Sequence, residues 1–287
     1  MADQLETSGL FEGLQWGTTN PPSTGMGIVD GGDLSGGSEL RVHQGIGGTE
    51  RRSDDLLKYG GNCNFLLSFT NFPFVQKAQR ASYPRGSLTS LYIEGGAENW
   101  SRVYSDALIR TLKLSSDEGG AISGSAEWNA LAIAEGDGLT PVDETADVFE
   151  DYETVVTIGG LEYGVLAWSI NLDNKVSDPK TNQDAKWGGT YRNPQFRLVG
   201  LEELTLEVTT GRPIDPDVLA LFGDVTTENL ATVITAGNGA KTFTATFANL
   251  KPNKPEGFGL VAPDEQGKWT YGFRGRGDTG SLTLAMA

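Results

Sequence analysis

The most regular feature of the chain is an alternation of apolar and polar residues with a period of two. The clearest alternating segments are 166–172, 204–208, 242–247, 268–273 and 281–286. Successive side chains of a strand point to opposite faces, so this pattern predicts strands with one buried and one solvated face. The second half of the chain is therefore predicted to form antiparallel β-structure.

The first half shows the same pattern less clearly. Segments 64–70, 87–93, 108–114 and 125–130 are also predicted to be strands. The spacing from Trp100 to Leu108 fits a helix behind an Asn99 cap almost as well as a strand, and we prefer the strand. The best helix prediction begins at Pro216 behind Asp215 and is stopped by Gly223.

Glycine and long polar connections divide these strands. The 39 glycines are densest before residue 62, which predicts an extended arm or loop there. Two long polar connections, 71–86 and 173–194, lie one in each half of the chain. Loops of this length without structure of their own are uncommon unless they have a function.

An acidic segment, 141–153, separates the two halves and contains no basic residue. We interpret it as a linker or an exposed acidic rim. The predicted fold class is all-β, with two tandem β-sandwich or barrel modules, long loops and at most short helices. Residues 1–140 form an N-terminal arm and the first module in this prediction, and residues 154–287 form the second. The halves share a loose layout of strand, long loop and strand, without a crisp sequence repeat.

Charge and rare residues exclude several functions. The chain has 22 basic and 38 acidic residues, a net charge of −16, which repels phosphate backbones and disfavours tight nucleic-acid binding. Cys63 is the only cysteine and His43 the only histidine, so no intramolecular disulfide and no cysteine- or histidine-based metal cage is expected. We see no secretion signal and no apolar stretch near the ~20 residues of a membrane helix, so we expect a cytosolic product without membrane insertion.

Three short motifs are better explained as chance than as chemistry. Gly275–Gly280 matches a dinucleotide-binding pattern but precedes a β-patterned tail in place of a helix. Adjacent acids such as Glu202 and Glu203 suit a glycosidase only if they converge on one sugar bond, and they arise by chance in so acidic a chain. Residues 173–184 lack the glycine and the glutamate of a calcium loop. We therefore predict a protein that is not an enzyme and needs no cofactor.

Aromatic residues point to contacts with a partner chain. Trp168 and Trp269 alternate with polar neighbours and are predicted to be core residues. Trp187 and Tyr191 flank two glycines within a long polar loop, where such side chains are costly to leave in water. The predicted oligomer interface consists of Trp187, Tyr191, Phe72, Phe74 and Asp178.

Three stretches together resemble a known family. Residues 108–127 look like two strands joined by a glycine turn, residues 165–208 look like a strand, a stacking loop and a strand, and the chain closes on a further strand pair. This layout, over about residues 40–287, resembles the tail tube proteins of long-tailed bacteriophages. Members of that family stack as rings into a hollow tube, whose lumen holds the tape measure protein and later conducts DNA.

The resemblance implies a structural virion protein that is assembled in the host cytoplasm and located in the tail. Its partners are then further copies of itself, the tape measure protein, tail-tip and terminator proteins, and double-stranded DNA that passes without specific binding. Two modules per chain imply a trimeric ring with pseudo-sixfold symmetry, although a hexamer of larger subunits stays open. Two other classes also stay open: a glycan-binding β-sandwich or adhesin with Trp187 and Tyr191 as its platform, and a glycosidase.

Overall fold

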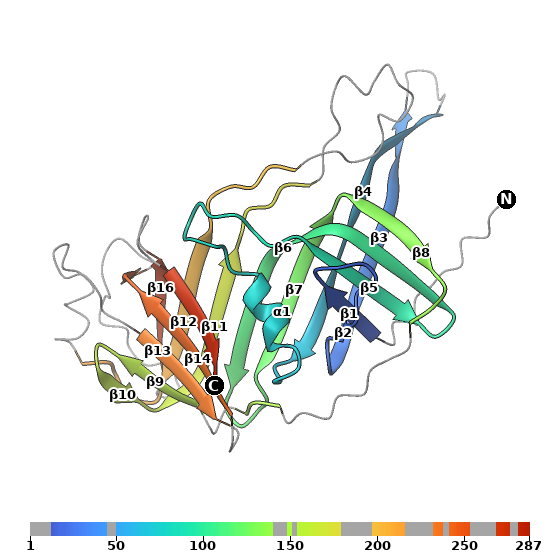
Figure 1. Cartoon of the computed structure of the whole chain (residues 1–287). Coiled ribbons are helices and arrows are strands. Elements are labelled where there is room, and N and C mark those ends of the chain that lie inside the picture. Colours follow the sequence, from blue (N-terminus) through green and yellow to red (C-terminus); the bar gives the residue numbers. More distant parts are fainter. Residues whose placement is uncertain are drawn as a thin grey trace.

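The computed structural model describes residues 13–44, 50–139, 148–150, 154–178, 197–215, 232–237, 241–252, 268–275 and 281–287. Side chains are described throughout these ranges except in 37–44 and 50–58, where the backbone alone is described. Within these ranges nearly all regular structure is antiparallel strand, with one short helix (Figure 1). The predicted all-β fold class is confirmed, and neither sheet of the described strands closes into a barrel.

The strands and the helix have the following bounds. The first half contains β1 (Gly13–Gly17), β2 (Thr24–Gly25), β3 (Val29–Gln44), β4 (Glu50–Leu66), α1 (Phe72–Lys77), β5 (Leu91–Ala97), β6 (Trp100–Asp117), β7 (Ser123–Ala130) and β8 (Ala132–Gly136). The second half contains β9 (Thr154–Ile158), β10 (Leu161–Tyr163), β11 (Val165–Asp173), β12 (Glu203–Thr210), β13 (Thr232–Gly237), β14 (Thr242–Ala248), β15 (Leu250–Pro252), β16 (Trp269–Gly275) and β17 (Ser281–Met286).

Eight strands form the main sheet, in the order β3-β4-β7-β6-β11-β12-β16-β15. All of these pairs are antiparallel. The long strand β6 takes part in two sheets, because its later part pairs with β7 and β11 whereas its earlier part pairs with β5 and β8. Asp106 lies between the two parts with φ of 53°, a turn conformation that is uncommon for a non-glycine residue.

Two further strand sets complete the fold. The first runs β2-β1-β5-β6-β8 and shares β6 with the main sheet. The second is a separate five-stranded sheet, β10-β9-β13-β14-β17. We call them the first and second covering sets. One continuous hydrophobic core includes residues of both sets and of the main sheet.

The two halves of the chain have the same strand order. In the main sheet, the first half contributes β3, β4, β7 and β6, and the second half contributes β11, β12, β16 and β15; in each case the last two strands are swapped relative to the sequence. The two covering sets also share one strand order. Strands β10, β9, β13, β14 and β17 of the second set correspond to β2, β1, β5, the early part of β6 and β8 of the first. Asn249, with φ of 53°, lies between β14 and β15 where Asp106 lies within β6.

Helix α1 and its neighbours fill the core with aromatic rings. Phe72 packs against Phe243 with ring centroids 5.9 Å apart, and Phe74 packs against Trp16 at 5.8 Å and Phe65 at 6.4 Å. Such edge-on pairs contribute about 0.5–1.5 kcal/mol each beyond the area that they bury. The rings join elements that are far apart in the sequence.

The alternating segments of the second half are strands as predicted, and Trp100–Leu108 belongs to strand β6. The boundaries are less accurate in the first half, where β4 ends at Leu66 and β5 begins at Leu91. Helix α1 lies inside the predicted loop 71–86. The helix predicted after Asp215 lies outside the described residues.

The loop alternative for the region before residue 62 is wrong for the described residues, because the glycine-rich region forms β3 and most of β4. Glycine serves close packing here. A side chain at Gly61 would come within 2.6 Å of the Asp33 carbonyl oxygen and of the Trp128 ring, and a side chain at Gly32 would collide with the Asn62 carbonyl oxygen. The absence of side chains therefore permits the strands to approach one another.

The acidic segment 141–153 is described only at residues 148–150. There Phe149 is fully buried, its N–H donates to the Leu67 carbonyl oxygen at 3.0 Å, and its carbonyl oxygen accepts from the Ile122 N–H at 2.7 Å. At Phe149 the segment is thus part of the core and not an exposed rim. The predicted division into residues 1–140, 141–153 and 154–287 stays a prediction.

Candidate assembly site

The main sheet has one apolar face in the core and one polar face outside it. The pairing register places the polar residues of neighbouring strands on the same face, because cross-strand partners share a face. Its uncharged members include Asn62, Asn64, Thr111, Ser115, Ser123, Ser125, Ser169, Asn171, Thr205, Thr209 and Thr270. None of these side chains is buried. The uncharged part of this face therefore consists of small polar groups.

Acidic residues slightly outnumber basic residues on this polar face. The acidic residues are Asp33, Asp117, Glu127, Asp173, Glu203 and Glu207, and the basic residues are Arg110, Lys113, Lys175, Lys251 and Arg274. Arg110 lies 3.3 Å from Glu127, and Lys175 lies 2.6 Å from Asp173 and 2.7 Å from Glu203. Charges of both signs on this surface are thus partly neutralised.

Neither outer strand of the main sheet has a second strand partner among the described strands, although Arg102 and Tyr104 of β6 donate to the carbonyl oxygens of Leu34 and Ser35 in β3 at 3.0 and 3.1 Å. Strand β3 pairs only with β4, and β15 pairs only with β16. Strand β4 pairs with β7 only from Tyr59 to Leu66, so the β3–β4 hairpin extends beyond the sheet as a two-stranded ribbon, at the top of Figure 1. An open edge exposes backbone donors and acceptors, which makes it a template for pairing with another chain.

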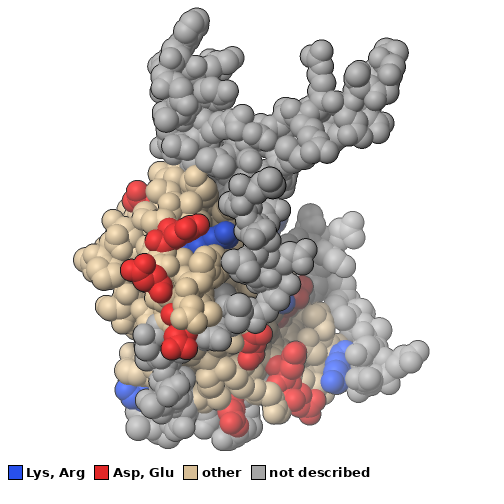
Figure 2. All heavy atoms as spheres, turned by 90° about the vertical axis from the view of Figure 1, so that its right-hand side faces the viewer, with Lys and Arg blue, Asp and Glu red and all other residues tan. Residues whose placement is uncertain are grey.

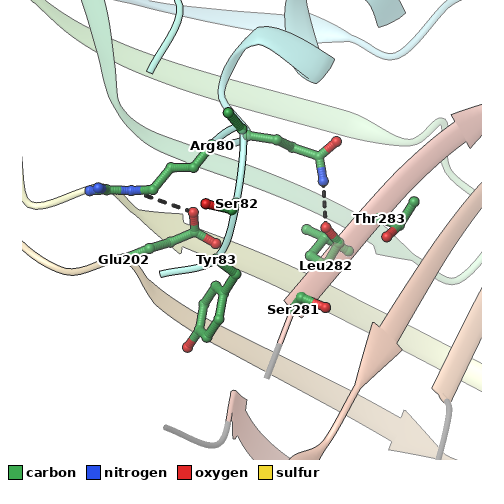
Figure 3. Close-up of a pocket in the computed structure, with 9 residues that line it drawn as sticks. Arg80, Ser82, Tyr83, Glu202, Ser281, Leu282 and Thr283 are labelled. Atoms are coloured by element: carbon green, nitrogen blue, oxygen red, sulfur yellow. Dashed lines mark hydrogen bonds and ion pairs between the residues drawn. The ribbon is translucent and has the colours of Figure 1, made fainter. Parts of the chain in front are cut away.

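The edge of the second covering set is occupied by side chains of the same chain. Gln79 donates from Nε2 to the Leu282 carbonyl oxygen at 2.6 Å (Figure 3). Gln76 donates from Nε2 to the Leu284 carbonyl oxygen at 3.1 Å. These two carbonyl groups belong to β17, the last strand of the set. The glutamines therefore satisfy acceptors at an edge that would otherwise be open.

Arg80 connects the segment after α1 to both stems of the second long loop, which are residues 174–178 and 197–202. Its Nη2 donates to the carbonyl oxygens of Asn174 and Gly200, each at 2.7 Å, and its Nη1 donates to that of Gly86 at 3.2 Å. Its Nε lies 3.6 Å from Oε2 of Glu202, and the two side chains are only 3% and 5% exposed. Asn174 is buried as well. A planar guanidinium with five donors is suited to such a junction.

Burial dominates the electrostatics of this ion pair. Burial raises the pKa of Glu202 to about 7, although the charge of Arg80 acts in the opposite direction. Burial also lowers the pKa of Arg80, against the attraction of Glu202. The pair borders a small polar cavity of about 210 Å³, which Ser82, Tyr83 and Thr283 help to line (Figure 3).

The stems of the second long loop are fixed next to each other. Val176 and Val199 form a β-bridge, the Ser177 N–H donates to the Leu198 carbonyl oxygen at 2.8 Å, and the Leu198 N–H donates to Ser177 Oγ at 2.9 Å. Despite this fixed backbone, Leu198 is 57% and Leu201 55% exposed. This apolar cluster was not predicted from the sequence, where its signal is the run Leu198-Val199-Gly200-Leu201 shortly before β12.

The structure does not bring the predicted interface residues together. Trp187 and Tyr191 lie outside the described residues. Asp178 is exposed and lies 3.6 Å from Arg110. Phe72 and Phe74 are 3% and 0% exposed and pack within the core, so a contact with another copy at α1 would have to use other side chains. The interface role of the five residues stays a prediction.

The described residues offer little for catalysis or for sugar binding. Glu202 pairs with Arg80, whereas Glu203 is exposed and pairs with Lys175, so the two acids do not converge. Trp16, Trp128 and Trp168 are buried and provide no stacking platform. Within the described ranges no three histidine, cysteine, aspartate or glutamate side chains are grouped to hold a metal ion. Over the same ranges no helix has the length and apolarity needed to cross a membrane.

Open sheet edges, a bare polar sheet face and the lack of a catalytic group among the described residues are typical of a structural β-protein that associates through its sheets. The chain belongs to the phage tail tube protein family, whose model matches residues 10–268. A search of curated proteins finds no match. The chain is therefore a structural subunit of the virion tail tube that self-assembles, and it is not an enzyme. The resemblance found in the sequence is confirmed.

Proposed function

We propose that this subunit forms the tube wall by extending its main sheet from one copy to the next, so that the joined sheets surround the lumen. The observation that carries the proposal is the eight-stranded main sheet, which is covered on its apolar face, bare on its polar face and open at both edges. The apolar face, which carries the two covering sets, must point outward in such a ring. The bare polar face then lines the lumen.

The repeated strand order supports a trimeric ring. Within one chain β6 pairs with β11, and this pair joins the four main-sheet strands of the first half to those of the second. Pairing of β15 with β3 of the next copy would repeat, between two chains, the junction that β6 and β11 form within one chain. We assign the two modules to residues 1–140 and 154–287, with 141–153 between them, so that three chains present six similar modules.

Barrel geometry favours three copies over six. Three copies of eight strands give 24 strands, and with a spacing of about 4.8 Å and a tilt of ~40° they close at about 48 Å between backbone centres. Six copies would give a barrel of roughly twice that width, about 96 Å. The narrower barrel suits a conduit for a single extended molecule better than the wider one.

The polar lining suits cargo that must pass without adhering. Each contact of a phosphate with lysine or arginine adds affinity through counterion release, and two of the basic side chains in the proposed lining, Arg110 and Lys175, are already paired with acidic residues. Acidic groups also repel a duplex within a Debye length, ~8 Å at physiological salt. Acidic side chains also dominate the described part of the face shown in Figure 2, which agrees with the net charge of −16.

This lining fits the partners implied by the family resemblance. The tape measure protein would occupy the lumen before infection and double-stranded DNA would pass during it, while tail-tip and terminator proteins would meet the two ends of the tube. Assembly takes place in the host cytoplasm in this proposal. We further assign the loop 173–194, with Trp187, Tyr191 and Asp178, to contacts between subunits or rings, because Arg80 fixes both of its stems.

Negative-stain microscopy of the purified protein over a range of concentrations tests self-assembly. We expect rings at intermediate and tubes at high concentration, with a sedimentation coefficient that rises accordingly. Strictly monomeric behaviour at every concentration would overturn the proposal.

A further inference from the structure

We infer that the rings stack head to tail through two exposed apolar patches at opposite ends of the main sheet. The upper patch consists of Leu198, Val199 and Leu201, and the lower patch consists of Ile28 and Phe69. The upper patch of one copy binds the lower patch of a copy in the next ring. The inference rests on the proposed ring and identifies which surfaces join one ring to another.

The pairing register places the patches at opposite ends. Asp173 pairs with both Glu203 and Thr111, so the upper patch, just before β12, lies at the end of the sheet where β11 finishes and β12 begins. At the other end, β3 begins opposite the end of β4, and the Leu66 N–H donates to the Ile28 carbonyl oxygen at 3.2 Å. Strands β11 and β12 run between these ends from top to bottom in Figure 1.

The upper patch is exposed on a fixed backbone. Leu198, Val199 and Leu201 are 57%, 42% and 55% exposed. The Gly200 N–H donates to the Lys175 carbonyl oxygen at 3.0 Å, and Arg80 donates to the Gly200 carbonyl oxygen. The patch is therefore already ordered before it meets a partner, which lowers the entropy cost of binding.

The lower patch is ordered by a buried amide. Ile28 is 40% and Phe69 41% exposed. Asn71 donates from Nδ2 to the carbonyl oxygens of Met26 at 3.1 Å and Leu66 at 2.6 Å, and its Oδ1 accepts from the Ser68 N–H at 3.0 Å. These bonds hold the residues before β3 against those after β4, so this patch is preorganised too.

The positions of the two patches and the number of copies in a ring indicate that each patch binds a second copy of this chain. A contact between two different surfaces of identical chains repeats without closing and produces a filament, which is the form of a tube built from stacked rings. Each patch is small, yet all copies of a ring engage together, and such multivalency converts weak contacts into a stable junction. Exposed apolar side chains on ordered backbone at both ends of one sheet match this requirement.

Serine substitution of the upper patch tests the inference. The Leu198→Ser/Leu201→Ser variant should fold, with unchanged circular dichroism, and should still form rings, while the concentration needed for tubes rises about tenfold or more. Leu161→Ser is the matched control, because Leu161 is 48% exposed but lies in β10, at the edge of the second covering set. The control should form tubes at the wild-type concentration.

Mixing experiments test the head-to-tail direction. The upper-patch variant keeps an intact lower patch, so a small fraction of it should cap growing wild-type tubes and shorten them. The Ile28→Ser/Phe69→Ser variant should do the same, and a variant with all four substitutions should not.

The outcomes are distinct. Normal tubes from the upper-patch variant would overturn the stacking inference and leave the proposed ring untouched. Loss of rings together with tubes would also overturn the inference, because the patch would then act within the ring. Lower thermal stability without any change in stacking would show that the patch is covered within its own chain, which also overturns the inference. Failure of the wild-type chain to assemble at all would overturn the proposed function itself.

Discussion

Arg80 and Glu202 form a buried ion pair, with 3.6 Å between Nε and Oε2, that joins the segment after α1 to the start of β12. The same guanidinium donates to the carbonyl oxygens of Asn174 and Gly200, one on each stem of the second long loop. The positions of both stems therefore depend on a residue from the first half of the chain.

Replacing Arg80 by methionine should destabilise the fold strongly. The Arg80→Met variant leaves the Glu202 carboxylate buried without its partner, and removing one member of a buried pair costs about 3–5 kcal/mol. Urea unfolding measures the loss. Lys113→Met is the control, because Lys113 lies on the exposed polar face and its loss should change stability by less than about 0.5 kcal/mol. Similar losses for both variants would contradict the assigned role of Arg80.

Glu202 should make stability fall as the pH rises toward neutrality. Its pKa in the folded protein, about 7, lies above the ordinary value of 4.5, so the folded state holds this proton more tightly than the unfolded state. The resulting stabilisation is complete below pH 4.5 and is lost as the pH rises through 7. The Glu202→Gln variant cannot titrate. Relative to the variant, the wild type should lose unfolding free energy between these pH values, and a constant difference would refute the assignment.

The two glutamines after Val75 should protect the edge of β17. Gln76→Ala/Gln79→Ala leaves the Leu284 and Leu282 carbonyl oxygens without these donors, at a cost of about 1 kcal/mol per hydrogen bond. We also expect more disordered aggregation on heating, measured by light scattering, because the edge becomes open to pairing. Ser82→Ala, which alters the same cavity, is the control. Equal scattering from both variants would exclude a protective role.

Deleting residues 178–188 should separate folding from assembly. The stems on both sides are held by the Val176–Val199 bridge and by Arg80, so the subunit should keep its circular dichroism spectrum and its cooperative unfolding. Loss of Trp187 should weaken contacts between copies, because aromatic anchors dominate interface energetics. Sizing chromatography and microscopy measure the effect. Normal tubes from the deletion variant would reject the assignment of this loop to assembly.

The strands were predictable where one face is buried and the other solvated. Trp168, Ile170 and Leu172 of β11 are buried and alternate with polar residues, so a local pattern was sufficient. The glycine-rich strands were not predictable in this way, since Gly32 and Gly61 are required by close approach of other strands. Helix α1 was missed because its six residues make fewer than two turns, too few to show a repeating helical pattern.

The assembly site was less predictable than the fold. The polar faces of the strands follow from the same alternation, but the strand order that joins them into one surface depends on long-range pairing such as β6 with β11. Glu202 was visible only as one of two adjacent acids, because its partner Arg80 lies far away in the sequence. Phe72 and Phe74 were assigned to an interface because the contacts that bury them, with Phe243 and Trp16, are also long-range and not visible in the sequence.

Cryo-electron microscopy of the assembled tube tests the central claim most directly. We expect three copies per ring, main sheets joined edge to edge from β15 of one copy to β3 of the next, and the face that carries Lys113, Asn171 and Glu207 turned toward a net acidic lumen. Copies that meet through other elements, or a main sheet whose polar face points away from the lumen, would contradict the account.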